Sequence, residues 1–297
     1  MDIAVVGAGK WGEALAFAFS QKNSVVVASA TGRKSSLKNF VSIREALKRD
    51  FVVVAISAQY IRSWLEEHFE DREQKILVAS KGIEISTGNL LNELFSEFVD
   101  EQNIAFLSGP SFAKEVNLAL PTALVVSSTN LDLAKEYVDA FPDFIKGYAD
   151  SDVVGAEVGG AYKNVIAIAG GLCDGLELGN NARASLISRG LVEMARFGVS
   201  LGAEERTFLS LGGAGDLFLS ASSRLSRNYR VGFGLAEGKT LAEILEELGE
   251  VAEGVGTAKA LHKISKERDI YLPIAREVYE VLHGKKPEES LEDLLKG

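Results

Sequence analysis

The chain has 297 residues, of which 46% are hydrophobic and 25% charged, and its formal net charge is −10 at pH 7. The length predicts two domains, and the negative charge argues against a nucleic-acid partner while still allowing a local basic pocket for an anion. A single cysteine excludes an internal disulfide, and with three scattered histidines we expect no metal site. We find no leader and no apolar run long enough to span a membrane, so we expect a cytoplasmic protein.

The first half of the chain alternates short apolar runs with amphipathic segments. The apolar runs predict strands at residues 3–6, 24–29, 51–57, 75–80, 104–108 and 122–127. The amphipathic segments predict helices at residues 11–22, 43–48, 60–69, 89–99 and 131–141. Strands that alternate with helices indicate a doubly wound parallel sheet covered on both faces.

The strand pattern stops at about Ala149, and the sequence from Ser151 onward is rich in Ala, Leu and Glu at helical spacing. We therefore predict an α/β domain over residues 1–150 and an all-helical substrate domain over residues 151–297. No low-complexity linker separates the two, so the cleft between them is the expected site.

A glycine-rich turn joins the first predicted strand to the first predicted helix. It reads Gly7-Ala8-Gly9-Lys10-Trp11-Gly12. In this context Gly-x-Gly-x-x-Gly is the fingerprint of a Rossmann-type dinucleotide-binding domain. Gly7 allows the tight turn, Gly9 lets a pyrophosphate approach, and Gly12 lets helix and strand pack, while the helix N-terminus offers amides to the phosphates.

The end of the second predicted strand bears on the choice of cofactor. NAD-selective domains carry a carboxylate about 20 residues after the glycine turn, at the ribose 2′-hydroxyl. Residues 27–34 contain none, whereas Arg33 and Lys34 suit a 2′-phosphate. We therefore expect NADPH rather than NADH, with NADH still possible. The alternative is that Arg33 and Lys34 are solvated loop charges.

Lys163 lies in an apolar, glycine-rich segment where a charge is unexpected. Apolar side chains at positions 158, 162, 165, 169 and 172 follow the spacing of a buried helical stripe. Burying an unpaired ammonium is costly, so this lysine should have a partner or a task, and burial moves its pKa towards the range useful for proton transfer. The alternative is that its stem packs while its head reaches solvent.

Further polar clusters suit an anionic substrate. Lys81 follows the fourth predicted strand, and the turn from Gly109 to Ser111 follows the fifth, at the edge where such sheets bind ligands. Asp216 follows a glycine loop that we expect to be flexible, and Ser226-Arg227-Asn228 combines a planar cation with two hydrogen-bonding side chains, as phosphate requires. Taken singly, each cluster has a simpler explanation. Lys81 fits a solvated lysine, and the Gly109–Ser111 segment fits an ordinary turn. Asp216 fits a helix cap, and residues 226–228 fit the end of a surface helix.

Together these stretches closely resemble the bacterial-type NAD(P)-dependent glycerol-3-phosphate dehydrogenases, over essentially the whole chain. The resembling stretches are residues 7–12, 80–84, 108–115, 159–168, 180–183, 213–217, 226–228 and 251–254. The resemblance implies reversible reduction of dihydroxyacetone phosphate to sn-glycerol 3-phosphate, which supplies the glycerophospholipid backbone. It also implies a homodimer.

The same resemblance implies roles for single residues. Lys163 is expected to be the general acid/base, Lys81 to contact substrate and cofactor, and Asp216 to bind a substrate hydroxyl or orient the lysine. Further expected substrate contacts are Gly109, Ser111, Ser226, Arg227 and Asn228. Besides the glycine turn and Arg33, the expected cofactor contacts are Lys10, Trp11, Lys81, Ala113, Arg227, Val251 and Glu253. Arg183 is expected to help seat the substrate.

Two departures from the family pattern are visible. Residues 30–49 form a shorter segment than is usual and lack a Pro-containing loop, which puts the adenine-end contacts in doubt. Ala214 stands where a larger residue is common, with little expected consequence.

Two other functions compete with this interpretation. The β-hydroxyacid dehydrogenases share the architecture but typically place lysine and asparagine one helical turn apart, whereas Lys163 and Asn164 are adjacent. A silent NADP(H)-binding sensor has no need for Lys81, Lys163 and Asp216.

Overall fold

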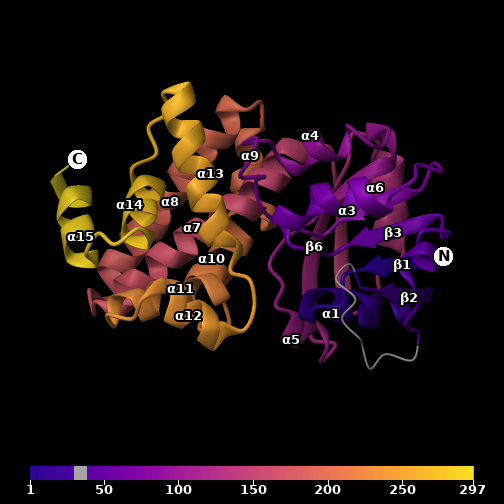
Figure 1. Cartoon of the computed structure of the whole chain (residues 1–297), viewed down its shortest axis with the longest axis horizontal. Helices are drawn as coiled ribbons and strands as arrows, with labels where there is room; N and C mark the ends of the chain where they lie inside the picture. Colours follow the sequence, from indigo (N-terminus) through magenta and orange to yellow (C-terminus); the bar gives the residue numbers. More distant parts are fainter. Residues whose placement is uncertain (30–38, 297) are drawn as a thin grey trace.

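Residues 1–29 and 39–296 are described by the computed structural model, so Arg33 and Lys34 lie outside the described residues. Figure 1 shows two parts side by side, a sheet with its helices and a bundle of helices. The strands are β1 (Asp2–Val6), β2 (Ser24–Ala28), β3 (Phe51–Val54), β4 (Lys75–Val78), β5 (Ile104–Ser108), β6 (Thr122–Ser127) and β7 (Ile145–Asp150). All seven belong to one sheet with the order β2-β1-β3-β4-β5-β6-β7.

Strands β1 to β5 are mutually parallel, as predicted, and the doubly wound fold is confirmed. Leu15 of α1 and Tyr137 of α6 pack on one face of the sheet, and Leu65 of α3 and Phe95 of α4 pack on the other. The strand order reverses at β1, between β2 and β3, and such a switch point opens a crevice for ligands at the carboxyl ends of the strands.

Two features of the sheet differ from the prediction. Strand β6 is antiparallel to β5, so that β6 and β7 run against the rest. Strand β7 was not predicted, because Ile145–Asp150 contains Lys146, Gly147 and Asp150 and has no apolar run. It lies at the edge of the sheet, where Ile145 packs into the core while Lys146 and Tyr148 are exposed, so the strand has no continuous apolar run.

Helices of the sheet part are mostly short. They are α1 (Lys10–Ser20), α2 (Ile43–Ala46), α3 (Ile61–His68), α4 (Leu91–Phe95), α5 (Ala113–Val116) and α6 (Leu131–Asp139), with 3-10 turns η1 (Ala58–Tyr60) and η2 (Glu101–Asn103). Within the described residues, no helix combines the length and the apolar content needed to cross a bilayer.

After β7 every described element is helical. These elements are α7 (Val153–Gly175), α8 (Gly179–Ser200), α9 (Glu205–Phe208), the π-helical turn η3 (Leu211–Gly215), α10 (Asp216–Ala221), α11 (Arg227–Ala236), α12 (Leu241–Leu248), α13 (Glu253–Arg268), α14 (Pro273–Leu282) and α15 (Pro287–Lys296). Helix α7 is buried on every side, not only along the predicted stripe, because α8, α10, α11, α13 and α14 surround it (Figure 1). A charged residue, Lys163, therefore lies midway along the central helix of the bundle.

Candidate active site

Lys163 donates hydrogen bonds to two side chains, and both belong to the short helix α10. Only 7% of the residue is exposed, so its head does not reach solvent. Its Nζ donates to Asp216 Oδ1 at 2.5 Å and to Ser220 Oγ at 2.8 Å. Asp216 is the first residue of α10 and is fully buried, and Ser220 lies one turn further on the same face of that helix. Helix α10 thus fixes the position of the ammonium.

Lys81 reaches the same carboxylate from the sheet part. Its Nζ donates to Asp216 Oδ2 at 2.6 Å and approaches the carbonyl oxygen of Gly109 at 3.4 Å. Its stem passes over Gly160 of α7, where a Cβ atom would lie 3.3 Å from the Lys81 Cγ. One buried carboxylate therefore joins two ammonium groups that come from opposite halves of the molecule.

Burial and charge both act on the ionisation of this cluster. Loss of solvent lowers the pKa of Lys163 to about 8, with the charges of Lys81 and Arg227 acting in the same direction and Asp216 opposing them. Burial by itself would raise the pKa of Asp216, but the two ammonium groups outweigh it and hold that pKa below its usual value. The cluster combines one carboxylate with two ammonium groups, and this excess of positive charge favours an anionic or polarised ligand.

The glycine-rich segment before Asp216 is ordered rather than flexible, which corrects the expectation from sequence. Leu211–Gly215 forms a π-helical turn that packs against α7. A Cβ atom on Gly213 would lie 2.3 Å from the carbonyl oxygen of Phe208, so this close packing requires glycine. Such π-helical turns occur often at functional sites, and this one leads directly into Asp216.

The glycine turn after β1 has the shape that a dinucleotide requires. Gly7 has φ +120°, and a Cβ atom there would lie 2.3 Å from the carbonyl oxygen of Ala55. A Cβ atom on Gly9 would meet nothing within 4 Å, so the backbone is open to an approaching group at that point. Gly9 precedes α1 and supplies no side chain to cap it, which leaves the amides of the first turn for a phosphate. The residues present therefore fit a pyrophosphate.

Other residues expected near a cofactor come from both halves. Trp11 donates from Nε1 to the carbonyl oxygen of Ala79 at 3.1 Å, just beyond β4. Ala113 is the first residue of α5, and Val251 is exposed. Glu253 is the first residue of α13, and burial raises the pKa of its carboxyl group above the usual value. A Cβ atom on Gly82 would lie 3.4 Å from Glu253 Oε2, so Glu253 faces the segment that carries Lys81.

Of the three residues predicted at the start of α11, Ser226 and Asn228 hold the helix in place, and Arg227 is exposed to solvent. Ser226 Oγ caps the helix by accepting from the Tyr229 amide at 3.3 Å. Asn228 donates to Asn164 Oδ1 at 2.9 Å and accepts from the Gly254 amide at 2.9 Å, so its side chain ties α7 to α13. Arg227, the first residue of α11, is exposed and pairs with Glu250.

Two expected substrate contacts lie close together, and a third lies apart. Ser111 Oγ donates to the carbonyl oxygen of Gly109 at 3.2 Å, beside Lys81. Arg183 instead pairs with Asp174 at 2.9 Å, near the far end of α7 and about 16 Å along its axis from Lys163. Arg183 thus supports the end of the bundle and not the lysine cluster.

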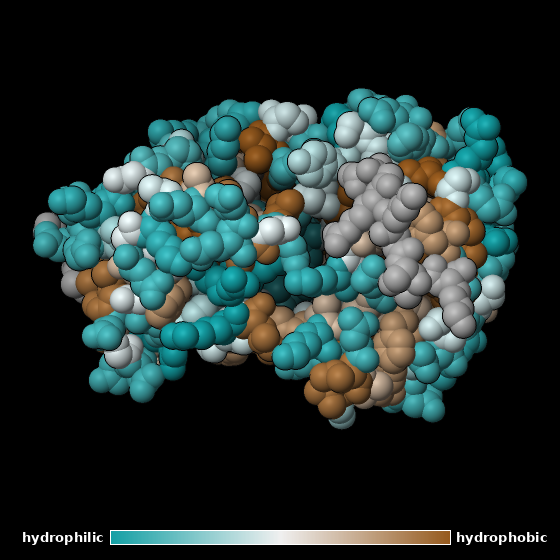
Figure 2. All heavy atoms as spheres, turned by 60° about the horizontal axis from the view of Figure 1, so that its bottom comes forward, coloured by the Kyte–Doolittle hydropathy of each residue, from teal (hydrophilic) through white to brown (hydrophobic). Residues whose placement is uncertain are grey.

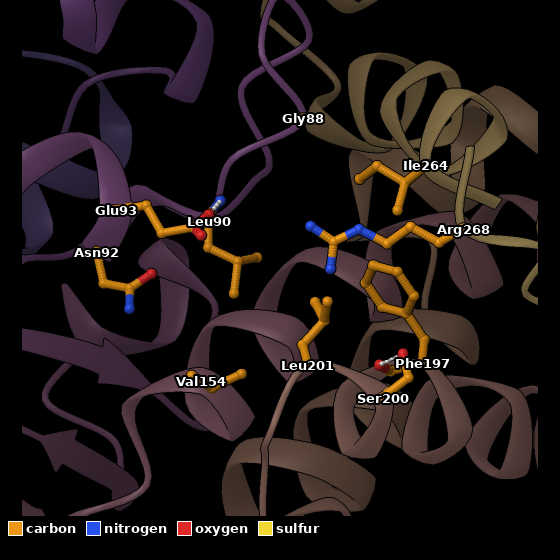
Figure 3. A pocket seen from close by; sticks show the side chains of 10 residues that line it. All are labelled: Gly88, Leu90, Asn92, Glu93, Val154, Phe197, Ser200, Leu201, Ile264 and Arg268. Carbon is orange, nitrogen blue, oxygen red and sulfur yellow. Dashed lines mark hydrogen bonds between the residues drawn. The ribbon is translucent and has the colours of Figure 1, made fainter. Parts of the chain in front are cut away.

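A hollow between the two halves, partly lined by hydrophilic residues, is visible in Figure 2. A separate cavity of about 210 Å³ lies between the segment before α4 and the ends of α8 and α13, and Figure 3 shows Phe197, Leu201 and Arg268 on its wall. None of the residues expected at the site lines that cavity.

Sequence reasoning missed two residues at the site, Ser220 and Glu250. The i, i+4 spacing from Asp216 to Ser220 was a signal that could have identified the serine. No comparable signal marked Glu250, because its two partners are distant in sequence.

Comparisons with known proteins agree with one another. Residues 31–134 match the family model described as NAD-dependent glycerol-3-phosphate dehydrogenase N-terminus, and residues 152–292 match the corresponding C-terminus model. Two curated relatives, the glycerol-3-phosphate dehydrogenases of Sulfurimonas denitrificans and of Nitratiruptor, are each 59% identical to this chain. Each match covers 99% of this chain and 98% of the relative. The crystal structure of the Coxiella burnetii glycerol-3-phosphate dehydrogenase has a TM-score of 0.92 at 28% identity, covering 100% of this chain and 99% of that one.

Proposed function

The chain belongs to the NAD(P)-dependent glycerol-3-phosphate dehydrogenase family and catalyses the reversible reduction of dihydroxyacetone phosphate to glycerol 3-phosphate, and we propose that Lys163 is its proton donor. The observation that carries this proposal is the buried cluster in which Lys163 and Lys81 share Asp216. It brings an ammonium with a pKa of about 8 to the interface between the two halves.

The chemistry divides between cofactor and side chains. A bound reduced nicotinamide supplies the hydride that adds to the carbonyl carbon. Lys163 polarises the carbonyl oxygen and transfers a proton from Nζ to it as negative charge develops there. In the reverse direction neutral Lys163 accepts the hydroxyl proton. Asp216 and Ser220 hold the lysine in place, and Lys81 adds a second positive charge beside the reacting oxygen.

Substrate selection follows from charge. The cluster of Lys81, Lys163 and Asp216 has a net positive charge, and Arg227 stands exposed at the N-terminus of α11. A guanidinium at a helix N-terminus is a good phosphate partner. We assign Arg227 to the substrate phosphate, with Ser226 and Asn228 holding the helix start in position, and Gly109 and Ser111 to the substrate turn.

The cofactor site is assigned to the sheet part. Residues 1–150 would bind the dinucleotide through the turn of Gly7, Gly9 and Gly12, and residues 151–297 would bind the substrate. The other proposed cofactor contacts come from both domains and are Lys10, Trp11, Lys81, Ala113, Arg227, Val251 and Glu253. NADPH is the proposed cofactor because residues 27–34 contain no carboxylate for a free ribose 2′-hydroxyl. Homodimerisation and a cytoplasmic location are proposed from the family resemblance.

An absorbance assay tests the proposed function. We expect dihydroxyacetone phosphate to cause oxidation of NADPH by the purified chain, with a higher kcat/KM for NADPH than for NADH. Dihydroxyacetone without the phosphate, offered at the same concentration, should react far more slowly because it forms no contact with Arg227. If the chain binds NADPH but no absorbance is lost with the phosphorylated ketone, the proposed residue roles are wrong. A preference for NADH would overturn the cofactor assignment alone.

A further inference from the structure

Glu250 lies in a loop of the helical part and pairs with residues from both halves of the molecule. Gly249, with φ +60°, ends α12, and Glu250 follows it before α13 begins. The far end of this loop is held in place, because Ala252 is buried and the Gly254 amide donates to Asn228 at 2.9 Å. The loop that carries Glu250 is thus anchored at its far end by the same asparagine that ties α11 and α13 to α7.

The Glu250 carboxylate pairs with two cations from opposite halves of the molecule. One oxygen meets Lys10 Nζ, and the other accepts from Arg227 Nη1 at 3.1 Å. Lys10 and Arg227 are the first residues of α1 and α11, helices of 11 and 10 residues. The Glu250 side chain is only 23% exposed although both of its partners are exposed. A carboxylate thus lies against two cations that each begin a helix.

A cation at a helix N-terminus is the arrangement that binds phosphoryl oxygens. Lys10 belongs to the glycine turn assigned to the cofactor pyrophosphate, and Arg227 is assigned to the substrate phosphate. A carboxylate paired with both cations takes up the donors that a phosphoryl group would use, and it repels that group when it approaches. We propose that Glu250 competes with ligand phosphoryl groups for Lys10 and Arg227 and thereby lowers the affinity of this site for phosphorylated ligands.

The proposal rests on the proposed function, because it assumes that phosphoryl groups bind beside Lys10 and Arg227. It adds a residue that limits affinity and so favours release. Both cations are exposed, and ion pairs with solvent-exposed partners are weak, so Glu250 yields to a ligand and does not block the site. The competing phosphoryl group can belong to the cofactor or to the substrate, and separate titrations distinguish the two.

The test is equilibrium binding to the full-length Glu250→Gln variant, which keeps the size of the side chain and removes its charge. We expect its Kd to fall roughly two- to five-fold relative to the unsubstituted chain, and the gain to shrink as salt is raised. NADPH, followed by its fluorescence, reports on the pyrophosphate, and glycerol 3-phosphate, followed by calorimetry, reports on the substrate phosphate. Neither readout requires turnover.

The matched control is Glu247→Gln, on the last turn of α12. Glu247 is exposed and pairs with Lys239 of the preceding loop at 2.8 Å, so this variant makes the same change in net charge at a different ion pair. We expect both of its Kd values to equal those of the unsubstituted chain.

A gain for one ligand supports the proposal and identifies the phosphoryl group with which Glu250 competes. Unchanged or weaker binding of both ligands by Glu250→Gln, or an equal gain in Glu247→Gln, would overturn it. If the unsubstituted chain turns over substrate normally in that case, the proposed function stands and only the role of Glu250 is rejected. A chain that binds neither ligand would overturn both.

Discussion

Replacing Lys163 by alanine is expected to lower kcat for dihydroxyacetone phosphate reduction by about 10²- to 10⁴-fold, the range typical of a lost general acid. The Kd for NADPH should change little, because the glycine turn after β1 belongs to the other half of the molecule. Lys163→Met, which keeps most of the side-chain volume, should lose as much activity as Lys163→Ala. Steady-state kinetics and a fluorescence titration of NADPH measure the two quantities.

The matched control for this result is Lys135→Ala. Lys135 is exposed on α6 and pairs with Asp132 at 3.0 Å, away from the cluster. Its loss should leave kcat unchanged. A near-normal kcat in either Lys163 variant would show that the proton comes from another group.

Asp216→Asn is expected to damage both stability and catalysis. The carboxylate is fully buried between Lys163 and Lys81, and removing it leaves two ammonium groups facing an amide. Breaking a buried ion pair in this way costs about 3–5 kcal/mol of unfolding free energy. Because Asp216 raises the pKa of Lys163, its loss should move that pKa below about 8, so that less of the lysine carries a proton at neutral pH. Urea unfolding and the pH dependence of kcat/KM measure the two effects.

Asp132→Asn is the corresponding control, since Asp132 is exposed and its pair with Lys135 should contribute no more than about 1 kcal/mol. If Asp216→Asn unfolds at the same urea concentration as Asp132→Asn and keeps the pH profile of the unsubstituted chain, the cluster has been misinterpreted.

Much of the fold was predictable because the local pattern agrees with the tertiary environment. The apolar runs of β1 to β5 are buried in the sheet, so their periodicity identified them. Strand β7 was not predictable in this way, because an edge strand with one face open carries polar residues. The reversed direction of β6 was not predictable either, because an apolar run has the same pattern whichever way its strand runs.

The residue types of the site were predictable, and so was a partner for Lys163, but its other connections were not. The apolar surroundings of Lys163 implied a partner, and Asp216 lies within hydrogen-bonding distance. That Lys81 shares the same carboxylate from 135 residues away is a product of domain packing. The same holds for Glu250, whose two partners come from different halves. The order of Leu211–Gly215 was missed because glycine-rich sequences suggest flexibility, whereas here the glycines permit close packing.

The most direct test of Lys163 as proton donor is the pH dependence of kcat/KM in both directions. Reduction requires the ammonium form and oxidation the neutral amine, and the pKa of Lys163 is about 8. We predict that kcat/KM for dihydroxyacetone phosphate falls about tenfold per pH unit above that value, and that kcat/KM for glycerol 3-phosphate falls in the same way below it. A reduction profile that stays flat well beyond this pH, with oxidation equally flat below it, would contradict the assignment of Lys163 as the proton donor.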